Sequence, residues 1–302
     1  MDILITGASG YVGAELVPRL LDDGHTVRTF ARDPAGVHAD VEVVQGDAVT
    51  GAGLDEALAG VEVAYYLIHS MEPGANGFRE RDHRAAEQFG AAAARAGVRR
   101  IVYLGGLVPG GGGASEHLAS RADVEATLLG AVPDSVALRA SIVIGARSRS
   151  FRFLVRLVER LPIVPLPAWR RFRTQPIDGR DVIAYLAAAA VSDRVGGEAL
   201  DIAGPDVLTY QQMIEHIRDA LVLNRPTWGL NVTMTPIASR VAAVIAGEDV
   251  ELVGPLMEGL TGDLVIRDDR ARELLGVRLH SFDAAVERAL RDWEAVEELR
   301  AR

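Results

Sequence analysis

The side chains in this sequence best suited to chemistry are His117 and Arg121, which stand four residues apart in the stretch "HLASR". Side chains at positions i and i+4 meet on one face of a helix, so both can contact one ligand. An imidazole titrates near neutrality and can donate a proton, whereas an arginine stays charged and donates hydrogen bonds to hydroxyl groups. The pair predicts proton transfer at His117 beside a hydroxyl-binding Arg121. The alternative is a solvated helix face with an ion pair between Arg121 and Glu125.

A glycine-rich turn, "TGASGYVG", follows the first apolar run of the chain. Gly7 permits a tight turn, Gly10 lets the backbone approach a pyrophosphate, and Gly13 lets the next helix pack closely on the strand. The free N–H groups and the dipole at the start of that helix favour an anion. Between a strand and a helix, the motif predicts a dinucleotide site. The residues expected to contact the dinucleotide are Gly7, Ser9, Gly10, Tyr11, Val12 and Gly13.

The end of the second strand, "TFARDP", bears on which dinucleotide binds. NAD sites hold the ribose 2′-hydroxyl with an acidic residue, and NADP sites accommodate the 2′-phosphate with an arginine. Arg32 stands at this position; Arg28 is a second candidate, although a solvated strand residue explains it equally well. Asp33 lies one residue further, before Pro34, where turn initiation accounts for it. We therefore expect NADP(H) in preference to NAD(H).

Apolar runs and helical patterns alternate in the first 145 residues and position these side chains. Strands that are apolar throughout, separated by helices, predict a parallel sheet covered on both faces. The expected fold class is α/β, a doubly wound parallel sheet of the Rossmann type with a smaller C-terminal substrate cap. Residues 1–145 plus 174–204 are expected to form the nucleotide-binding domain, and 146–173 plus 205–302 the cap. Strands are expected at 2–6, 26–30, 41–45, 61–68, 99–105, 135–143 and 198–204, and helices at 11–24, 78–97, 150–161, 179–191, 209–222 and 281–300.

Composition excludes several classes of function. The chain has 302 residues, a formal charge of −10 and no cysteine. The negative charge opposes binding to nucleic acid or an anionic membrane, and the lack of thiols excludes disulfides, thiol nucleophiles and cysteine-ligated metals. The seven histidines show no metal-ligand spacing, so no metal is expected. Without a signal-like or membrane-spanning run, we expect a cytoplasmic monomer or homodimer acting on a small molecule.

An arginine-rich segment, residues 147–173, contains Glu159 as its only acidic residue. Arg152, Arg156 and Arg160 recur at helical spacing, opposite an apolar face. The pattern favours a solvated helix face. Attraction of an acidic substrate or of cofactor phosphates is the alternative.

Seven segments follow one another in a specific order: TGASGYVG (6–13), GD (46–47), YYLIHSM (65–71), IVYLGGL (101–107), LRASIVIG (138–145), QPIDGRDVIAYL (175–186) and GGEALDIAGPDVLTYQQM (196–213). In this the sequence resembles the extended and atypical branches of the short-chain dehydrogenase/reductase superfamily, which include NmrA-like proteins and NAD-dependent epimerase types. The resemblance implies an NAD(P) cofactor. The further cofactor contacts that it implies are Asp47 and Ala48 near the adenine, Leu67, Ile68 and His69 after the fourth strand, Gly105 after the fifth, and Arg121.

The same resemblance reveals three departures. Active members carry an asparagine in the long helix, where this sequence has Asp82. Their fifth strand leads to a serine or threonine that polarises the substrate carbonyl, where this sequence has Gly105 and Gly106. Their next helix carries a tyrosine as general acid and a lysine four residues later, in place of His117 and Arg121. The expected catalytic set is therefore His117, Arg121 and Asp82.

We expect an NAD(P)(H)-dependent oxidoreductase that moves hydride to or from a small, mainly apolar carbonyl or enol compound, with His117 replacing the tyrosine. His69 and His83 are further acid/base candidates, although a surface helix position explains His83 better. A catalytically inactive NADP-binding sensor, similar to NmrA-like proteins, stays open because the serine, tyrosine and lysine are missing. An NAD(P)-dependent epimerase or dehydratase also stays open on the extended-type architecture.

Overall fold

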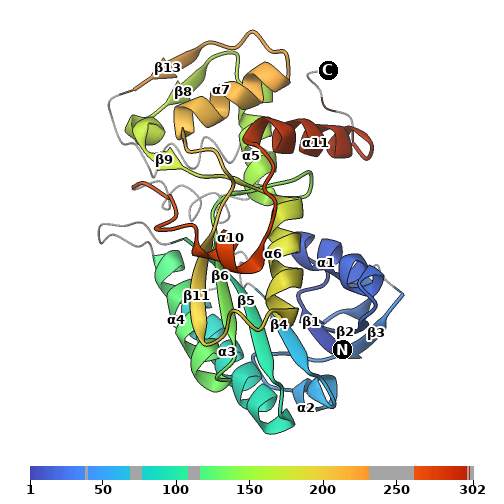
Figure 1. The fold of residues 1–302 in the computed structure, drawn as a ribbon. Helices are drawn as coiled ribbons and strands as arrows, with labels where there is room; N and C mark the ends of the chain where they lie inside the picture. The colour runs from blue at the N-terminus through green and yellow to red at the C-terminus, as the bar shows by residue number, and fades with distance from the viewer. Residues whose placement is uncertain (38–39, 69–76, 108–115, 231–261, 298, 300–302) are drawn as a thin grey trace.

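The computed structural model describes residues 1–37, 40–68, 77–107, 116–230, 262–297 and 299 (Figure 1). Seven strands form its central sheet in the order β3-β2-β1-β4-β5-β6-β11, and every pair of neighbours is parallel. The predicted α/β class with a doubly wound parallel sheet is confirmed. The strands are β1 (Asp2–Thr6), β2 (Thr26–Ala31), β3 (Glu42–Gln45), β4 (Val63–Tyr66), β5 (Arg100–Gly106), β6 (Val136–Ala140) and β11 (Glu198–Ile202).

The sheet is buried on both faces, which is why its strands are apolar along their whole length. On β1, Ile3 and Ile5 face one core and Leu4 faces the other, as the alternation of side chains requires. Figure 1 shows the two helix layers that cover these faces. The first layer is α1 (Tyr11–Asp22), α6 (Gly179–Val191) and α10 (Arg270–Leu275), and the second is α2 (Leu54–Leu58), α3 (Phe78–Ala96) and α4 (Glu116–Ala131).

A third apolar cluster lies beyond the carboxyl ends of the strands (Figure 1). It joins α5 (Arg149–Arg160), β8 (Val164–Leu166), α7 (Tyr210–Ala220) and α11 (Phe282–Glu294). Three short strand pairs accompany it: β7 (Val143–Ile144) with β10 (Ile177–Asp178), β9 (Arg173–Thr174) with β12 (Leu208–Thr209), and β8 with β13 (Thr227–Gly229). This cluster is the candidate cap. The domain boundaries stay a prediction, and α10, from the range expected for the cap, packs on the sheet.

Several expected strands are shorter than predicted: the runs 61–68 and 198–204 form β4 (Val63–Tyr66) and β11 (Glu198–Ile202). The run 135–143 leaves the sheet after Ala140, and the chain forms a separate strand, β7, that pairs with β10. The helix expected at 281–300 likewise ends at Glu294. In the described ranges, no helix combines the length and the apolar character that crossing a bilayer requires.

The arginine face of α5 is solvated only in part: Arg160 is exposed, as expected, but Arg152 is partly buried and Arg156 is buried. Arg156 is 7% exposed and donates hydrogen bonds to Glu159 Oε2, at 2.8 Å, and to Glu297. Its guanidinium lies 4.9 Å from the centre of the Trp293 ring, and that of Arg152 lies 4.3 Å from the same ring. Trp293 and Glu297 are far from α5 in the sequence, so the helical pattern alone could not reveal them. These two arginines hold α5 against α11.

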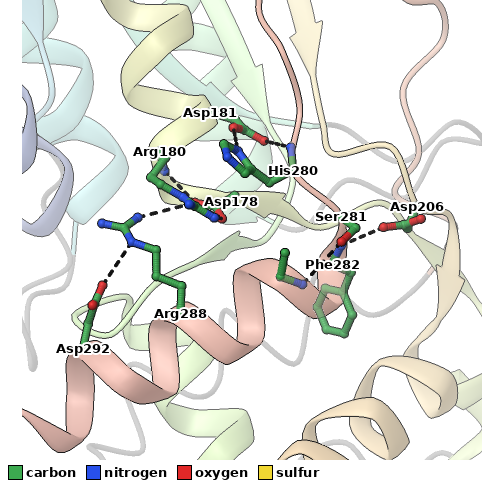
Figure 2. A network of polar contacts seen from close by, with 10 residues as sticks. Asp178, Arg180, Asp181, Asp206, His280, Ser281, Phe282, Arg288 and Asp292 are labelled. Atoms are coloured by element: carbon green, nitrogen blue, oxygen red, sulfur yellow. Dashed lines mark hydrogen bonds and ion pairs between the residues drawn. The ribbon is translucent and has the colours of Figure 1, made fainter.

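Two carboxylates, the buried Asp181 and the partly exposed Asp206, bind the segment before α11 (Figure 2). Asp181 of α6 accepts a hydrogen bond from the His280 N–H at 2.8 Å and contacts the ring Nδ1 at 2.6 Å. Burial raises the pKa of Asp181, and its bonds to His280 oppose that rise. Asp206 accepts from the Phe282 N–H at 2.7 Å. These bonds fix the start of α11, and with it the third cluster, beside the carboxyl edge of the sheet.

Candidate active site

The glycine turn joins the end of β1 to α1. Gly7 has a φ of 72°, and a β-carbon there would lie 2.6 Å from the Leu67 carbonyl oxygen. A β-carbon on Gly13 would lie 2.4 Å from the Gly7 carbonyl oxygen, so chain packing alone requires glycine at both positions. Gly10 is exposed, has φ −76° and ψ 167°, and a β-carbon there would lie 3.2 Å from the Gly7 carbonyl oxygen, a contact only slightly too short. Its missing side chain leaves an open cradle at the start of α1, which fits a pyrophosphate.

Thr6 holds the ends of β1 and β4 together. Its Oγ1 donates to the Tyr65 carbonyl at 3.0 Å and accepts from the Leu67 N–H at 3.1 Å. This clamp brings Leu67, and the partly buried Ile68 after it, beside Gly7. Sequence analysis missed Thr6 because its role depends on a strand almost sixty residues away. His69, expected in the same loop, lies outside the described residues.

The side chains of the turn differ in their surroundings. Tyr11 packs its hydroxyl against two glycines, where a β-carbon would lie 1.9 Å away on Gly145 and 2.1 Å away on Gly179. Burial, with the charge of Glu15, raises the pKa of Tyr11 to about 12. Val12 packs partly buried against the core under α1, and Ser9 is exposed. The Tyr11 phenol therefore packs α1 against α6, and contact of Tyr11 with the dinucleotide stays a prediction.

The two arginines considered as ligands of a 2′-phosphate, Arg32 and Arg28, have different surroundings. Arg32 is exposed at the carboxyl edge of the sheet, directly after β2. Arg28 is bound to Glu42 Oε2 at 2.9 Å and to two carbonyls at the end of α2, so it is not available to a ligand. The carboxylate of Asp33 accepts from the Ala35 N–H at 3.0 Å and caps the turn after the strand, as the turn interpretation predicted.

Asp47 and Ala48 follow β3 at the same edge of the sheet. Asp47 Oδ1 accepts from the Val49 N–H at 2.8 Å, and the Asp47 N–H donates to the Ala52 carbonyl at 3.0 Å. These bonds fold the loop into a tight turn with Asp47 partly exposed and Ala48 buried. Contact of Asp47 with an adenine ring stays a prediction.

Arg121 reaches the carboxyl end of β5. Its Nη2 donates to the Leu104 carbonyl at 2.9 Å, and the Tyr103 hydroxyl donates to the Arg121 carbonyl at 3.4 Å. A β-carbon on Gly105 would lie 3.1 Å from Tyr103 Cε1, so the tyrosine ring fills the space beside that glycine. His117 lies one turn before Arg121 in α4, but its side chain is outside the described part. The structure thus brings Arg121 and Gly105 together through Tyr103, which sequence analysis did not single out.

Asp82, in the second turn of α3, lies near two buried phenols. Burial, with the charge of Asp82 adding to it, raises the pKa of Tyr66; burial also raises that of Tyr103, to which Asp82 contributes less. The Asp82 charge is therefore close enough to these tyrosines of β4 and β5 to affect both. His83 is exposed and pairs with Glu87 at 3.3 Å, the surface position that the sequence favoured. Within the ranges described, no three His, Cys, Asp or Glu side chains gather as metal ligands.

These features define a class: a parallel-sheet domain with a glycine cradle at a helix N-terminus, built to bind a dinucleotide. A family model described as NAD(P)H-binding matches residues 7–127. Over 233 residues the chain is 31% identical to (4-alkanoyl-5-oxo-2,5-dihydrofuran-3-yl)methyl phosphate reductase of Streptomyces griseus, with 74% of each chain covered. The chain belongs to the atypical short-chain dehydrogenase/reductase family of NAD(P)-binding oxidoreductases.

Other matches agree with this family. Ceramide reductase of Caulobacter vibrioides is 29% identical over 222 residues, which cover 70% of this chain and 68% of the relative. UDP-glucose 4-epimerase of Thermotoga maritima superposes with a TM-score of 0.76 at 12% identity, with 98% and 99% of the two chains covered. A short-chain dehydrogenase/reductase protein of Agrobacterium tumefaciens with bound NAD gives 0.71 at 18% identity, with 98% of each chain covered. At such identities the solved structures show the fold alone.

Proposed function

We propose that this protein is an NADP(H)-dependent reductase or dehydrogenase of a small, mainly apolar carbonyl or enol compound. The observation that carries the proposal is the cradle at Gly10, an exposed glycine directly before the first turn of α1. The names of two relatives, a reductase of an alkanoyl-bearing phosphate ester and a ceramide reductase, support reduction of a molecule with an alkyl chain. A cytoplasmic location and a monomeric or homodimeric state remain predictions.

The preference for NADP(H) rests on the end of β2. Arg32 is exposed there, whereas the neighbouring carboxylate of Asp33 is used to cap a turn. Ser9 lies beside Gly36 of that turn and extends the polar surface. A 2′-phosphate would gain charge-assisted hydrogen bonds from the guanidinium, and a 2′-hydroxyl would find no carboxylate in the same place.

In the proposed reaction the bound nicotinamide supplies or accepts the hydride. Arg121 is anchored to the Leu104 carbonyl and directs a permanently charged group to the end of β5, where it binds ribose hydroxyls. His117 donates the proton that neutralises the developing alkoxide oxygen during reduction, and takes it back in the reverse direction. Arg121 cannot relay that proton because its guanidinium does not deprotonate. Asp82 adds a negative charge on the α3 side of the same edge.

Single-turnover absorbance of bound NADPH tests this proposal against a panel of alkyl ketones, aldehydes and enones. Oxidation of NADPH by at least one compound is the expected result. The His117→Ala variant should slow that oxidation by about 10²-fold or more, the usual effect of losing a general acid. His83→Ala, which removes an exposed histidine paired with Glu87, is the matched control and should leave the rate unchanged. An unaltered rate in His117→Ala would remove this residue from the mechanism.

A second candidate function is an NADP-binding sensor, which is favoured by the absence of the serine, tyrosine and lysine at positions 105, 117 and 121 taken together. Tight NADPH binding without oxidation by any compound in the panel would support the sensor and reject the reductase. An epimerase or dehydratase, which the shared fold permits, would convert a substrate while returning its cofactor unchanged. Product analysis by mass spectrometry distinguishes that outcome from the other two.

A further inference from the structure

Two nitrogens of a partly buried guanidinium on α3 have no hydrogen-bond acceptor among the described residues. Arg81 lies in the first two turns of this helix, and its Nε and Nη2 are buried and make no hydrogen bond to the described chain. The arginines around it differ, because Arg79 pairs with Asp123 at 2.6 Å and Arg84 is exposed. Buried polar groups in folded proteins are nearly always paired, and an unpaired buried charge is more costly than a neutral group. Arg81 therefore requires an explanation beyond the packing of the chain.

The spacing of residues along α3 shows where Arg81 lies. Arg81, Gln88 and Arg95 recur every seven residues, so they occupy one side of the helix. The Gln88 side chain lies against Gly51 in the loop after β3, and Arg95 pairs with Asp55 of α2 at 2.7 Å. That side of α3 therefore faces α2 and the loop that contains Asp47 and Ala48.

The direction of α3 shows how close Arg81 lies to the carboxyl edge of the sheet. Because α3 connects β4 to the parallel strand β5, it begins at the carboxyl edge of the sheet. Arg81 lies two turns, or about 10 Å, closer to that edge than Gln88 does. It is thus placed above the loop after β3, on the side of the edge where the adenosine half of a dinucleotide is expected.

We propose that Arg81 binds a phosphate group of a ligand at this edge. Nε and Nη2 form one edge of the planar guanidinium, which can donate two parallel hydrogen bonds to two phosphate oxygens. The phosphate belongs either to the dinucleotide, in which case the inference rests on the proposed function, or to a phosphorylated substrate. A carbonyl acceptor would satisfy the donors but would leave the positive charge uncompensated.

Titration of NADPH fluorescence and thermal unfolding with inorganic phosphate separate the two sources. The variant is Arg81→Gln, and the matched control is Arg84→Gln, which removes the same charge from an exposed position on the same helix. If Arg81 binds a phosphate of the cofactor, the NADPH dissociation constant should rise at least about tenfold in Arg81→Gln, because a hydrogen bond to a charged group is lost. In Arg84→Gln it should stay within about twofold of the wild-type value. For a substrate phosphate, NADPH binding is unchanged, but inorganic phosphate stabilises the NADPH complex of the wild type and of Arg84→Gln only.

Two further variants test the geometry. Arg81→Lys keeps the charge but loses the two-pronged edge, so its affinity should fall between that of the wild type and that of Arg81→Gln. Arg81→Met should raise the unfolding midpoint of the ligand-free protein, because it removes two buried N–H groups that lack acceptors, whereas a residue with a structural role would lower it. The proposal is overturned if Arg81→Gln matches Arg84→Gln with both probes, or if Arg81→Met unfolds more easily than the wild type. If the wild type failed to oxidise NADPH with every substrate, the proposed reaction would be rejected, but the tests of phosphate binding by Arg81 would still apply.

Discussion

Replacing Gly10 and Gly13 by alanine should produce opposite defects, although the motif treats the two glycines alike. A β-carbon on Gly13 would lie 2.4 Å from the Gly7 carbonyl oxygen and 2.8 Å from Ala8 Cα, both of which are backbone atoms. A carbon–oxygen contact normally lies near 3.3 Å, so α1 would have to shift by about 1 Å from β1. Overpacking of this kind costs about 1–3 kcal/mol, and the better helix propensity of alanine returns about 0.5–1 kcal/mol. We expect Gly13→Ala to lose about 1–2 kcal/mol of stability.

Gly10→Ala should fold almost normally. Its φ of −76° and ψ of 167° are open to alanine, and the added carbon would lie 3.2 Å from the nearest atom. We expect a stability change within about 0.5 kcal/mol, as for most exposed substitutions. The methyl group would, however, occupy the cradle that the pyrophosphate needs, and blocking that contact should weaken NADPH binding by about tenfold or more, or about 1.4 kcal/mol.

Urea unfolding without cofactor, followed by tryptophan fluorescence, measures the first effect, and an NADPH titration of the folded protein measures the second. We expect the two variants to fail in different assays. Gly13→Ala lowers the urea midpoint, whereas Gly10→Ala keeps the wild-type midpoint but binds NADPH more weakly. Normal NADPH affinity in Gly10→Ala would refute the reasoning, since no ligand would then need the cradle. A stable Gly13→Ala would show that the spacing between α1 and β1 is not what fixes that glycine.

Three further outcomes follow from single positions. Arg32→Glu should weaken NADPH binding by about tenfold or more while leaving NADH within about twofold, because only the 2′-phosphate loses a cation; equal losses for both cofactors in parallel titrations would contradict the proposed preference. Val222→Gly should stabilise the protein by about 0.5–1 kcal/mol, since this residue has a φ of 55° and is 85% exposed; an unchanged urea midpoint would mean that its backbone is not strained. Arg152, with Arg156, lowers the pKa of Glu297 below its ordinary 4.5, so this pair stabilises the fold above that pH and the stabilisation disappears as the pH falls through the lowered pKa. Glu297→Gln should therefore be less stable than the wild type at neutral pH and converge with it in acid, whereas a constant difference in unfolding midpoint from pH 7 to strong acid would show that the carboxylate charge is not involved.

The features that sequence analysis predicted are those encoded over short distances. The order of strands and helices and the glycine turn each depend on residues within one strand–helix unit, so periodicity and spacing were sufficient. The use of Asp33 as a turn cap is local in the same way, because its carboxylate binds the backbone two residues later.

The features that it missed depend on contacts between distant segments. Arg28 looked available until Glu42 and the end of α2 were placed beside it. The arginines of α5 looked solvated because Trp293 is contributed by the end of the chain. The seven-residue spacing of Arg81 from Gln88 and Arg95 is visible in the sequence and places the three residues on one side of a helix. It indicates what that side faces only once the partners of Gln88 and Arg95 are known.

Gly105 shows how the structure changes the interpretation of a departure from the family pattern. From the sequence, this glycine is a missing hydroxyl and an argument for lost activity. In the structure, the ring of Tyr103 fills the space where a side chain would begin, and its hydroxyl supports the Arg121 carbonyl. Arg121 in turn donates to Leu104, directly before the glycine. A β-carbon at position 105 would lie 3.1 Å from the Tyr103 ring, which would have to shift slightly, so packing beside Tyr103 is a second reason for this glycine. The glycine alone therefore does not distinguish a reductase from a sensor. The decision between the two functions therefore depends on His117, the group on the same helix that can carry a proton.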